Sequence, residues 1–149
     1  MRRDWLLRAG LLLVAVSPLG VGIWALFAPR SFFDDFPAAG RHWVSALGPY
    51  NEHLARDVGA LNLALGVLLV AAGVLLGRTL VRVSILAWLV YALPHLAFHV
   101  STLGVLSPLD DLANVLGLGF VVLLPLALLA VAGRDATSAA PSGLRRRGG

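Results

Sequence analysis

The chain of 149 residues contains no cysteine and no lysine. The absence of cysteine excludes disulfide bonds, cysteine-ligated metals and thiol redox chemistry. Charged residues make up only 13% of the chain, whereas 58% of the residues are hydrophobic. This balance excludes an ordinary soluble domain and is typical of an integral membrane protein.

All twelve basic residues are therefore arginine, and the formal net charge is +4. An excess of positive charge is also found in nucleic-acid-binding proteins. Here the arginines lie in short segments beside the apolar runs, where they orient a membrane protein instead. We therefore expect the lipid bilayer as the partner, and no nucleic acid.

Four long apolar runs occupy residues 5–28, 58–77, 80–103 and 109–132. Each run has the roughly 20 residues that a helix needs to cross about 30 Å of hydrocarbon. A transmembrane β-barrel would need short alternating segments, and these runs are continuous. The sequence therefore predicts an all-α fold, an integral membrane four-helix bundle that forms a single domain over residues 1–132.

The arginines also predict the orientation of the bundle. Nine of them lie in residues 2–8, 78–82 and 134–147, which four membrane crossings bring to one side. The other three lie in residues 29–57, on the opposite side. The positive-inside rule then predicts a multi-pass protein of the cell membrane with both termini in the cytoplasm. Residues 29–57 and the short loop around Ser107 would face outward.

The two terminal segments carry separate predictions. The first apolar run follows a basic start, as in a signal peptide, but it is longer than the usual core of about 7–15 residues. We expect it to be kept as a membrane helix, although cleavage stays an open alternative. Residues 133–149 are rich in small and polar residues and end in three consecutive arginines. They are predicted to form a disordered, basic cytoplasmic tail.

The first outer loop has an aromatic start. Phe32, Phe33 and Phe36 follow Pro29 and alternate with acidic residues. Rings and charges in this pattern favour a helix that lies in the membrane interface, with its aromatic side chains among the headgroups. We therefore expect a short interfacial helix in this loop.

Two histidines, His95 and His99, lie four residues apart inside the predicted third helix. Ionisable groups at membrane depth are costly and mark a site or a buried partner. This spacing places both imidazoles on one helical face, an arrangement that can chelate a metal ion, with Glu52 as a candidate third ligand. The alternative is that the rings only hydrogen-bond to Asn62, Tyr91 or carboxylates near the outer surface.

Polar residues of the second and fourth helices should reach the same outer level as the histidines. Asn62 shares a stripe with Gly59 and Gly66, and small residues on one stripe let another helix approach closely. Asn62 is therefore expected to face protein. The candidate ligand-binding residues, collected over the three helices, are Glu52, His53, Asn62, Tyr91, His95, His99 and Asn114.

Helix capping alone can explain some of the polar residues at the starts of the second and fourth helices, without a functional site. Asn51 is a good N-cap, and acidic residues in the following turn complement the helix dipole. Ser107 and Asp110 fit the same role before the fourth helix. Charged residues at i, i+4 spacing after Asn51 can pair along the helix. These pairs are His53 with Asp57 and Glu52 with Arg56.

Several functions stay open at this point. The expected pocket could hold a small ligand, a metal ion or a molecule such as a quinone or another lipid. Haem is disfavoured, because two histidines on one helical face cannot bind opposite sides of one haem. An isomerase or oxidoreductase with a His–Glu proton shuttle is the enzymatic alternative. A structural subunit of a homo-oligomer or a larger membrane complex is the third, and no motif names a reaction.

The stretch from Asn51 to Leu61, Asn-Glu-His-Leu-Ala-Arg-Asp-Val-Gly-Ala-Leu, resembles small four-helix DoxX-like membrane proteins of actinobacterial type. Four short helices and a long aromatic first outer loop strengthen this resemblance, which covers the four-helix region. It implies a membrane protein of a group sometimes linked to redox or quinone-related processes. It supplies no catalytic residues to carry over.

Overall fold

The computed structural model describes residues 2–133, and in this range the protein is entirely helical. Four helices are long and apolar enough to span a membrane, by their length and composition. The predicted all-α, four-helix fold is therefore confirmed, and these helices indicate a multi-pass membrane protein. The elements are α1 (Arg2–Phe27), α2 (Pro29–Asp35), the 3-10 turn η1 (Ser45–Leu47), α3 (Glu52–Leu75), α4 (Arg78–Ser101) and α5 (Pro108–Gly133).

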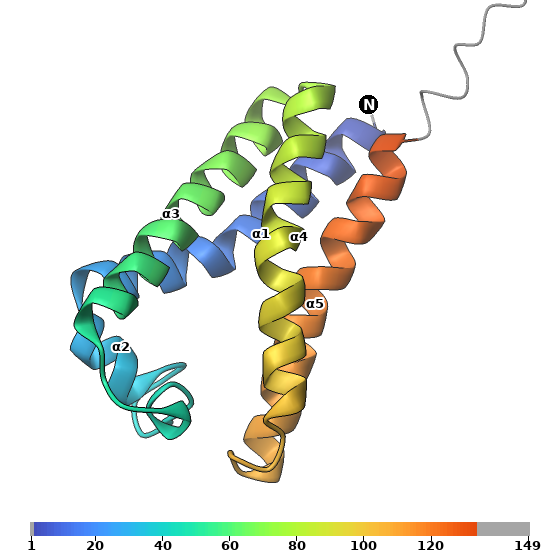
Figure 1. Cartoon of the computed structure of the whole chain (residues 1–149). Coiled ribbons are helices and arrows are strands. Elements are labelled where there is room, and N and C mark those ends of the chain that lie inside the picture. Colours follow the sequence, from blue (N-terminus) through green and yellow to red (C-terminus); the bar gives the residue numbers. More distant parts are fainter. Residues whose placement is uncertain (1, 134–149) are drawn as a thin grey trace, which may run out of the picture.

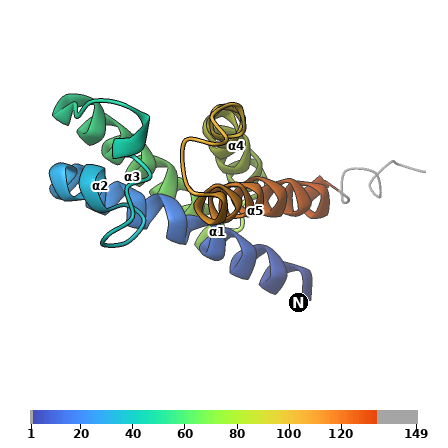
Figure 2. The same cartoon turned by 90° about the horizontal axis from the view of Figure 1, so that it is seen from below.

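The four long helices form a ring in which each packs on two others (Figure 1). Helix α1 lies between α3 and α5, and α4 closes the ring on the opposite side. The start of α1, the α3–α4 turn and the end of α5 lie together, and we call this the terminal end. The other end carries residues 28–51 and 102–107, and we call it the loop end. Toward the loop end, α1 and α3 diverge from α4 and α5 (Figures 1 and 2).

Small residues explain why α1 and α3 make the closest pair in the bundle. A Cβ atom added to Gly59 of α3 would lie 2.4 Å from the backbone nitrogen of Leu26 in α1. A Cβ atom added to Gly22 of α1 would lie 2.7 Å from the backbone nitrogen of Leu63. The two backbones therefore touch where side chains are missing, as the small-residue stripe predicts.

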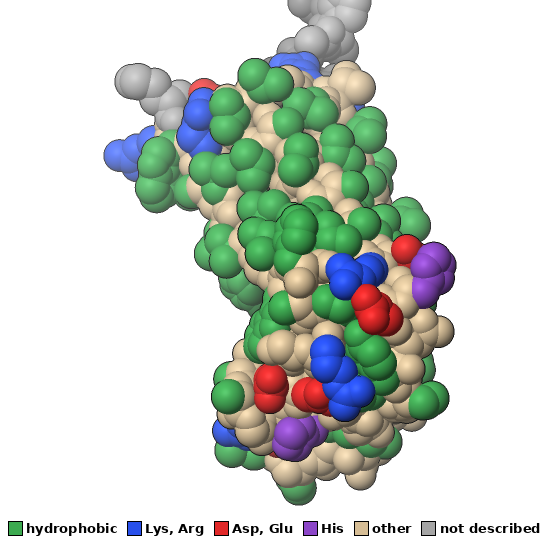
Figure 3. All heavy atoms as spheres, turned by 90° about the vertical axis from the view of Figure 1, so that its left-hand side faces the viewer, with side chains coloured by type: hydrophobic (Ala, Val, Ile, Leu, Met, Phe, Trp, Pro, Cys, Tyr) green, Lys and Arg blue, Asp and Glu red, His purple; other side chains and the backbone are tan. Residues whose placement is uncertain are grey.

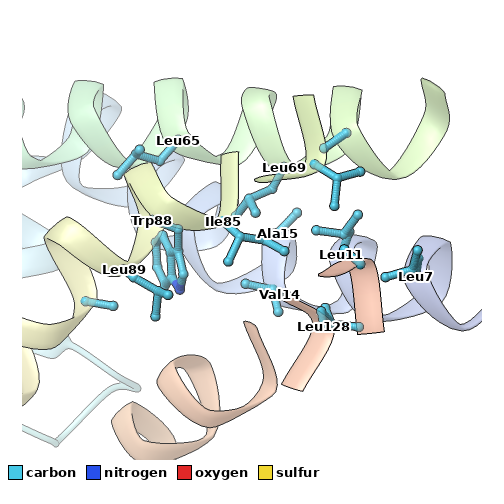
Figure 4. Close-up of a cluster of buried hydrophobic side chains, with 14 of the residues drawn as sticks. Leu7, Leu11, Val14, Ala15, Leu65, Leu69, Ile85, Trp88, Leu89 and Leu128 are labelled. Atoms are coloured by element: carbon cyan, nitrogen blue, oxygen red, sulfur yellow. The ribbon is translucent and has the colours of Figure 1, made fainter. Parts of the chain in front are cut away.

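The apolar core lies toward the terminal end and receives side chains from all four long helices (Figure 4). Leu11 of α1, Leu69 of α3 and Ile85 of α4 are fully buried, and Leu128 of α5 is 6% exposed. Close packing of this kind gives each buried side chain many weak contacts, which together hold the helices in place.

One hydrogen bond in this core repairs a break made by proline. Pro125 has no backbone N–H, so the carbonyl of Val121, four residues earlier, loses its helical donor. The indole Nε1 of Trp88 in α4 donates to that carbonyl at 2.7 Å. The buried tryptophan thus fills the core and also satisfies a main-chain acceptor of the neighbouring helix.

The predicted second span covers residues 58–77, and helix α3 extends it back to Glu52, where the N-cap pattern predicts the helix to begin. Asn51 caps the helix as expected, with its Oδ1 accepting from the backbone N–H of Leu54 at 3.1 Å. The polar residues after the cap are therefore the first turns of the helix and not a loop. The other predicted boundaries agree with the structure within three residues. The predicted tail lies outside the described residues, apart from Gly133 at the end of α5.

The short helix of the first loop is present as α2, with Phe32 buried at 7% exposure. Phe32 and the neighbouring Phe36 pack on each other and on Trp24 near the end of α1. Phe32 and Phe36 have centroids 5.1 Å apart, Trp24 lies 6.1 Å from Phe32, and Trp43 lies 6.2 Å from Phe36. The helix is as expected, whereas its position in the membrane interface stays a prediction.

An ion pair connects this loop with the start of α5. The Nη1 atom of Arg41 lies 2.5 Å from Oδ1 of Asp110. Asp110 belongs to the predicted cap, in which its backbone N–H donates to the hydroxyl of Ser107 at 3.2 Å. On the face shown in Figure 3, charged side chains gather at the loop end, and hydrophobic side chains cover the surface above them.

Candidate functional site

Five of the seven candidate residues form a continuous row of contacts from α3 across α4 to α5. We call this set the polar row, and it begins at Asn62, which is only 2% exposed. The side-chain nitrogen of Asn62 donates to the carbonyl of Val58 at 2.9 Å and to the hydroxyl of Tyr91 at 3.1 Å. The residues of the polar row are Asn62, Tyr91, His95, His99 and Asn114.

The middle of the polar row consists of three rings on one face of α4. The rings of Tyr91 and His95 are stacked, with centroids 5.4 Å apart and an interplanar angle of 16°. The rings of His95 and His99 meet edge to face at 4.8 Å. Residues four apart on a helix are neighbours, so this arrangement follows directly from the spacing.

Asn114 of α5 ends the polar row. Its side-chain nitrogen lies 2.9 Å from Nδ1 of His99, and the residue is 7% exposed. The amide donates to Nδ1 when the imidazole is neutral and carries its proton on Nε2. Asn114 therefore orients His99 and cannot be assigned to helix capping.

A groove lies beside the polar row, between α3 and α4. Its volume is about 520 Å³, and it is open along one side. Most of its lining is apolar, with Tyr91 and His95 as the polar members. The groove is formed by Leu61 and Leu65 of α3 and by Ala87, Val90, Tyr91, Pro94 and His95 of α4.

His95 is the one member of the polar row without a hydrogen bond inside residues 2–133. Its ring is half-buried, lines the groove and contacts only the rings of Tyr91 and His99 among the polar row. A neutral imidazole carries one donor and one acceptor nitrogen. A group that occupies the groove could bond to either of them.

Glu52 and His53, the other two candidates, do not join the polar row. The Oε1 atom of Glu52 accepts from Nε of Arg56 at 2.9 Å, and Nε2 of His53 lies 3.1 Å from Oδ2 of Asp57. Both pairs are exposed and follow the i, i+4 spacing of the first turns of α3. The expected contact of Glu52 with the histidines is therefore not formed, because a closer partner on its own helix takes the carboxylate.

This placement removes the geometry that a metal site would need. Within the described range, no three His, Cys, Asp or Glu side chains are grouped so as to hold a metal ion. The predicted metal set of His95, His99 and Glu52 is thus not assembled. The alternative of a His–Glu proton shuttle stays a prediction, although Glu52 pairs with Arg56 and not with a histidine.

The sequence does not predict the apolar wall of the groove. Leu61, Leu65, Ala87 and Val90 look like ordinary membrane-facing residues, because nothing in their identity distinguishes a groove from a lipid-facing surface. Pro94 was the available signal, since a proline inside a helix disturbs the packing around it.

No protein-family profile, no curated protein and no solved structure matches this chain. The resemblance to DoxX-like proteins therefore stays a prediction. The function has to be argued from the polar row and the groove.

Proposed function

We propose that the protein binds a lipophilic small molecule in the groove between α3 and α4, within the cell membrane. The terminal end would face the cytoplasm, since it carries the arginines of residues 2–8 and 78–82. The loop end, the polar row and the wider part of the bundle would then lie toward the outer surface. A DoxX-like membrane protein linked to quinones would agree with this proposal.

The apolar walls indicate where the occupant comes from. Leu61 is 48% exposed and Val90 is 76% exposed, and both lie at the margin of the groove. In a bilayer these side chains face acyl chains, so the groove is reached sideways from the hydrocarbon. The groove has a volume of about 520 Å³ and is shallow and wide open, so an occupant would be held between its apolar walls and the surrounding acyl chains.

The free imidazole of His95 carries the proposal. A polar group without a partner in an apolar environment costs roughly 2–7 kcal/mol, and no water is present in hydrocarbon to reduce this cost. An ordinary acyl chain would fill the groove and leave the imidazole unbonded. A lipophilic molecule with a polar head, such as a quinone, would fill the groove and also bond to His95.

The test uses the full chain in vesicles of phosphatidylethanolamine and phosphatidylglycerol. The probe is a naphthoquinone with a short isoprenoid tail, and its binding is followed by quenching of tryptophan fluorescence. Trp88 makes this readout suitable, because its ring lies 5.5 Å from that of Tyr91, which lines the groove.

Two pairs of variants decide the outcome. Ala87→Phe fills the groove and should weaken quenching about tenfold, whereas Ala97→Phe, on an exposed part of α4 outside the groove, should not. His95→Phe should weaken it as well, and the exposed His53→Phe should leave it unchanged. Equal binding by Ala87→Phe and Ala97→Phe would count against the groove. If the histidine variants only impair folding and no probe binds, a structural subunit is the better interpretation.

A further inference from the structure

We infer that Arg8 of α1, at the terminal end of the bundle, binds the phosphate of an anionic phospholipid. Arg8 does not line the groove, so this site does not depend on the proposed function. The partner is a lipid of the surrounding membrane, held at the bundle surface by its headgroup.

The arginines at the two ends of the bundle differ in their partners. Each of the three arginines at the loop end is paired with a carboxylate of the protein. The pairs are Arg30 with Asp34, Arg41 with Asp110 and Arg56 with Glu52. At the terminal end, residues 2–133 hold five arginines and a single acidic residue, Asp4. One carboxylate cannot neutralise five guanidinium groups, so part of the positive charge at this end lacks a counter-charge within these residues.

The packing of α1 on α3 shows where Arg8 lies. Three glycines of α3, spaced by seven residues, each face a leucine of α1, and these leucines are also spaced by seven residues. The facing residues are Gly59 and Leu26, Gly66 and Leu19, and Gly73 and Leu12. Continued by one more turn, this antiparallel register brings Arg8 level with Gly77, in the turn between α3 and α4. Arg78 opens α4 directly after this turn, so two helices contribute positive charge at this level.

Arg56 shows what an arginine does in the same position at the loop end. Both arginines lie about one turn beyond the last close contact of α1 with α3. The Nη1 atom of Arg56 donates to the carbonyl of Leu26 at 2.6 Å, and Glu52 pairs with its guanidinium. Arg8 makes no hydrogen bond and no ion pair within residues 2–133, and it is exposed. Its five N–H donors are therefore open to a molecule outside the protein.

The surroundings of Arg8 favour a lipid as this molecule. Trp5 and Leu12 lie on the same side of α1, and they are 66% and 37% exposed. Tryptophan favours the level of the headgroups, and an arginine can cover apolar surface while its charge reaches the phosphates. A guanidinium binds two phosphate oxygens in parallel. Phosphatidylethanolamine neutralises its phosphate with its own ammonium, so phosphatidylglycerol, which keeps a net negative charge, is the better partner.

The experiment uses the full chain in dodecyl maltoside micelles. The probes are phosphatidylglycerol, phosphatidylethanolamine with the same acyl chains, and inorganic phosphate. Native mass spectrometry gives the affinity for each lipid, and thermal unfolding shows how far each probe stabilises the fold. Phosphatidylglycerol should bind most tightly and raise the unfolding midpoint. Inorganic phosphate should not raise it, because it has no acyl chains to lie on the apolar surface of α1.

The decisive variant is Arg8→Gln, which should weaken the binding of phosphatidylglycerol about tenfold, the effect of losing about one charge-assisted hydrogen bond. Arg8→Lys keeps the charge and should retain most of the affinity. Arg56→Gln is the matched control, since it removes the same charge at the other end of the helix pair, and it should leave the affinity unchanged. Without lipid, Arg8→Gln should unfold like the wild type, because Arg8 has no bond to lose.

The other outcomes would overturn the inference. Equal affinity of the wild type for the two lipids would exclude a site for anionic lipid, and this comparison needs no variant. Equal stabilisation by inorganic phosphate would mean that the site takes a soluble anion. If Arg2→Gln weakens binding as much as Arg8→Gln, the charge of the whole terminal end attracts the lipid, and Arg8 is not its site. A lower midpoint of Arg8→Gln without lipid would assign Arg8 a structural role.

Discussion

The terminal end and the loop end of the bundle are built from the same helices but packed in different ways. In α4 the last buried residue is Ala92, and in α5 the apolar buried residues begin only at Val122. On the terminal side of these positions, apolar side chains from all four helices are buried against one another. On the loop side, Asn114 is the only buried residue of either helix.

The two ends also differ in how their polar groups are bonded. At the terminal end, the carbonyl left free by Pro125 has a donor in Trp88. The loop end leaves His95 without a hydrogen bond and keeps a groove beside it. In a bilayer, close van der Waals packing holds helices together, whereas unpaired polar groups destabilise the fold. The close packing of the terminal end therefore accompanies a looser loop end, where the proposed ligand would bind.

The largest expected effect comes from breaking the α1–α3 contact that supports both ends. Gly59→Leu would force a side chain into the backbone of Leu26, so α1 and α3 would have to separate. We expect a loss of about 3 kcal/mol or more, at the upper end of the range for overpacking. Chemical unfolding in detergent, followed by helical circular dichroism, measures this loss.

Gly20→Leu provides the control for that substitution. A Cβ atom added to Gly20 of α1 meets nothing within 4 Å, so this variant should unfold like the wild type. Similar losses in both variants would mean that leucine itself, and not the close approach of α1 and α3, causes the effect.

A medium effect is expected from the bond between Trp88 and Val121. Trp88→Phe should cost about 1–3 kcal/mol, because the carbonyl of Val121 becomes a buried acceptor without a donor. Pro125→Ala restores a backbone N–H that can donate to the same carbonyl. In the double variant the tryptophan bond is no longer needed, so the loss should be smaller than in Trp88→Phe alone.

A double-mutant cycle on thermal unfolding in vesicles measures this coupling. The four proteins are the wild type, the two single variants and the double variant. Strictly additive changes would show that the indole stabilises the terminal end by packing alone, with no contribution from the carbonyl that proline leaves free.

The smallest effect on stability is expected at the loop end, where Arg41 and Asp110 are partly exposed. Their side chains are 48% and 17% exposed, and ion pairs of this kind contribute about 0–1 kcal/mol. Arg41→Ala should therefore hardly change the unfolding midpoint. It should instead increase hydrogen exchange in residues 38–47, which lose their connection to α5.

The exposed pair of Arg30 and Asp34 offers the matched control. Both its members belong to α2, so Arg30→Ala removes a charge without separating the loop from α5. If Arg30→Ala raises exchange in residues 38–47 as much as Arg41→Ala does, the connection to Asp110 is not what holds this loop.

The sequence was sufficient for the four helices because their length and hydropathy are local properties. The glycine stripe of α3 also predicted a close helix contact, since glycines let another helix approach closely whichever helix that is. The position of Glu52 was not predictable in this way. Its depth and its place on the polar stripe of the second helix predicted a position near the histidines, but α3 diverges from α4 toward the loop end and Glu52 pairs with Arg56 one turn away (Figure 1).

The groove depends on a property that no single residue encodes. It exists because α3 and α4 diverge toward the loop end, and this divergence results from the packing of the whole ring (Figures 1 and 2). The bond between Trp88 and Val121, by contrast, could be predicted from the sequence. Pro125 predicts a free carbonyl at Val121, and a tryptophan on a neighbouring helix is a suitable donor.

The two-residue turn between α3 and α4 sets the angle between these two helices. Leu76 ends α3 in the left-handed conformation, and α4 starts after Gly77, so the two helices share a short pivot. A helix of 24 residues is about 36 Å long, so a change of about 5° at the pivot moves its far end by about 3 Å. The width of the groove therefore depends on the angle that this turn sets between α3 and α4.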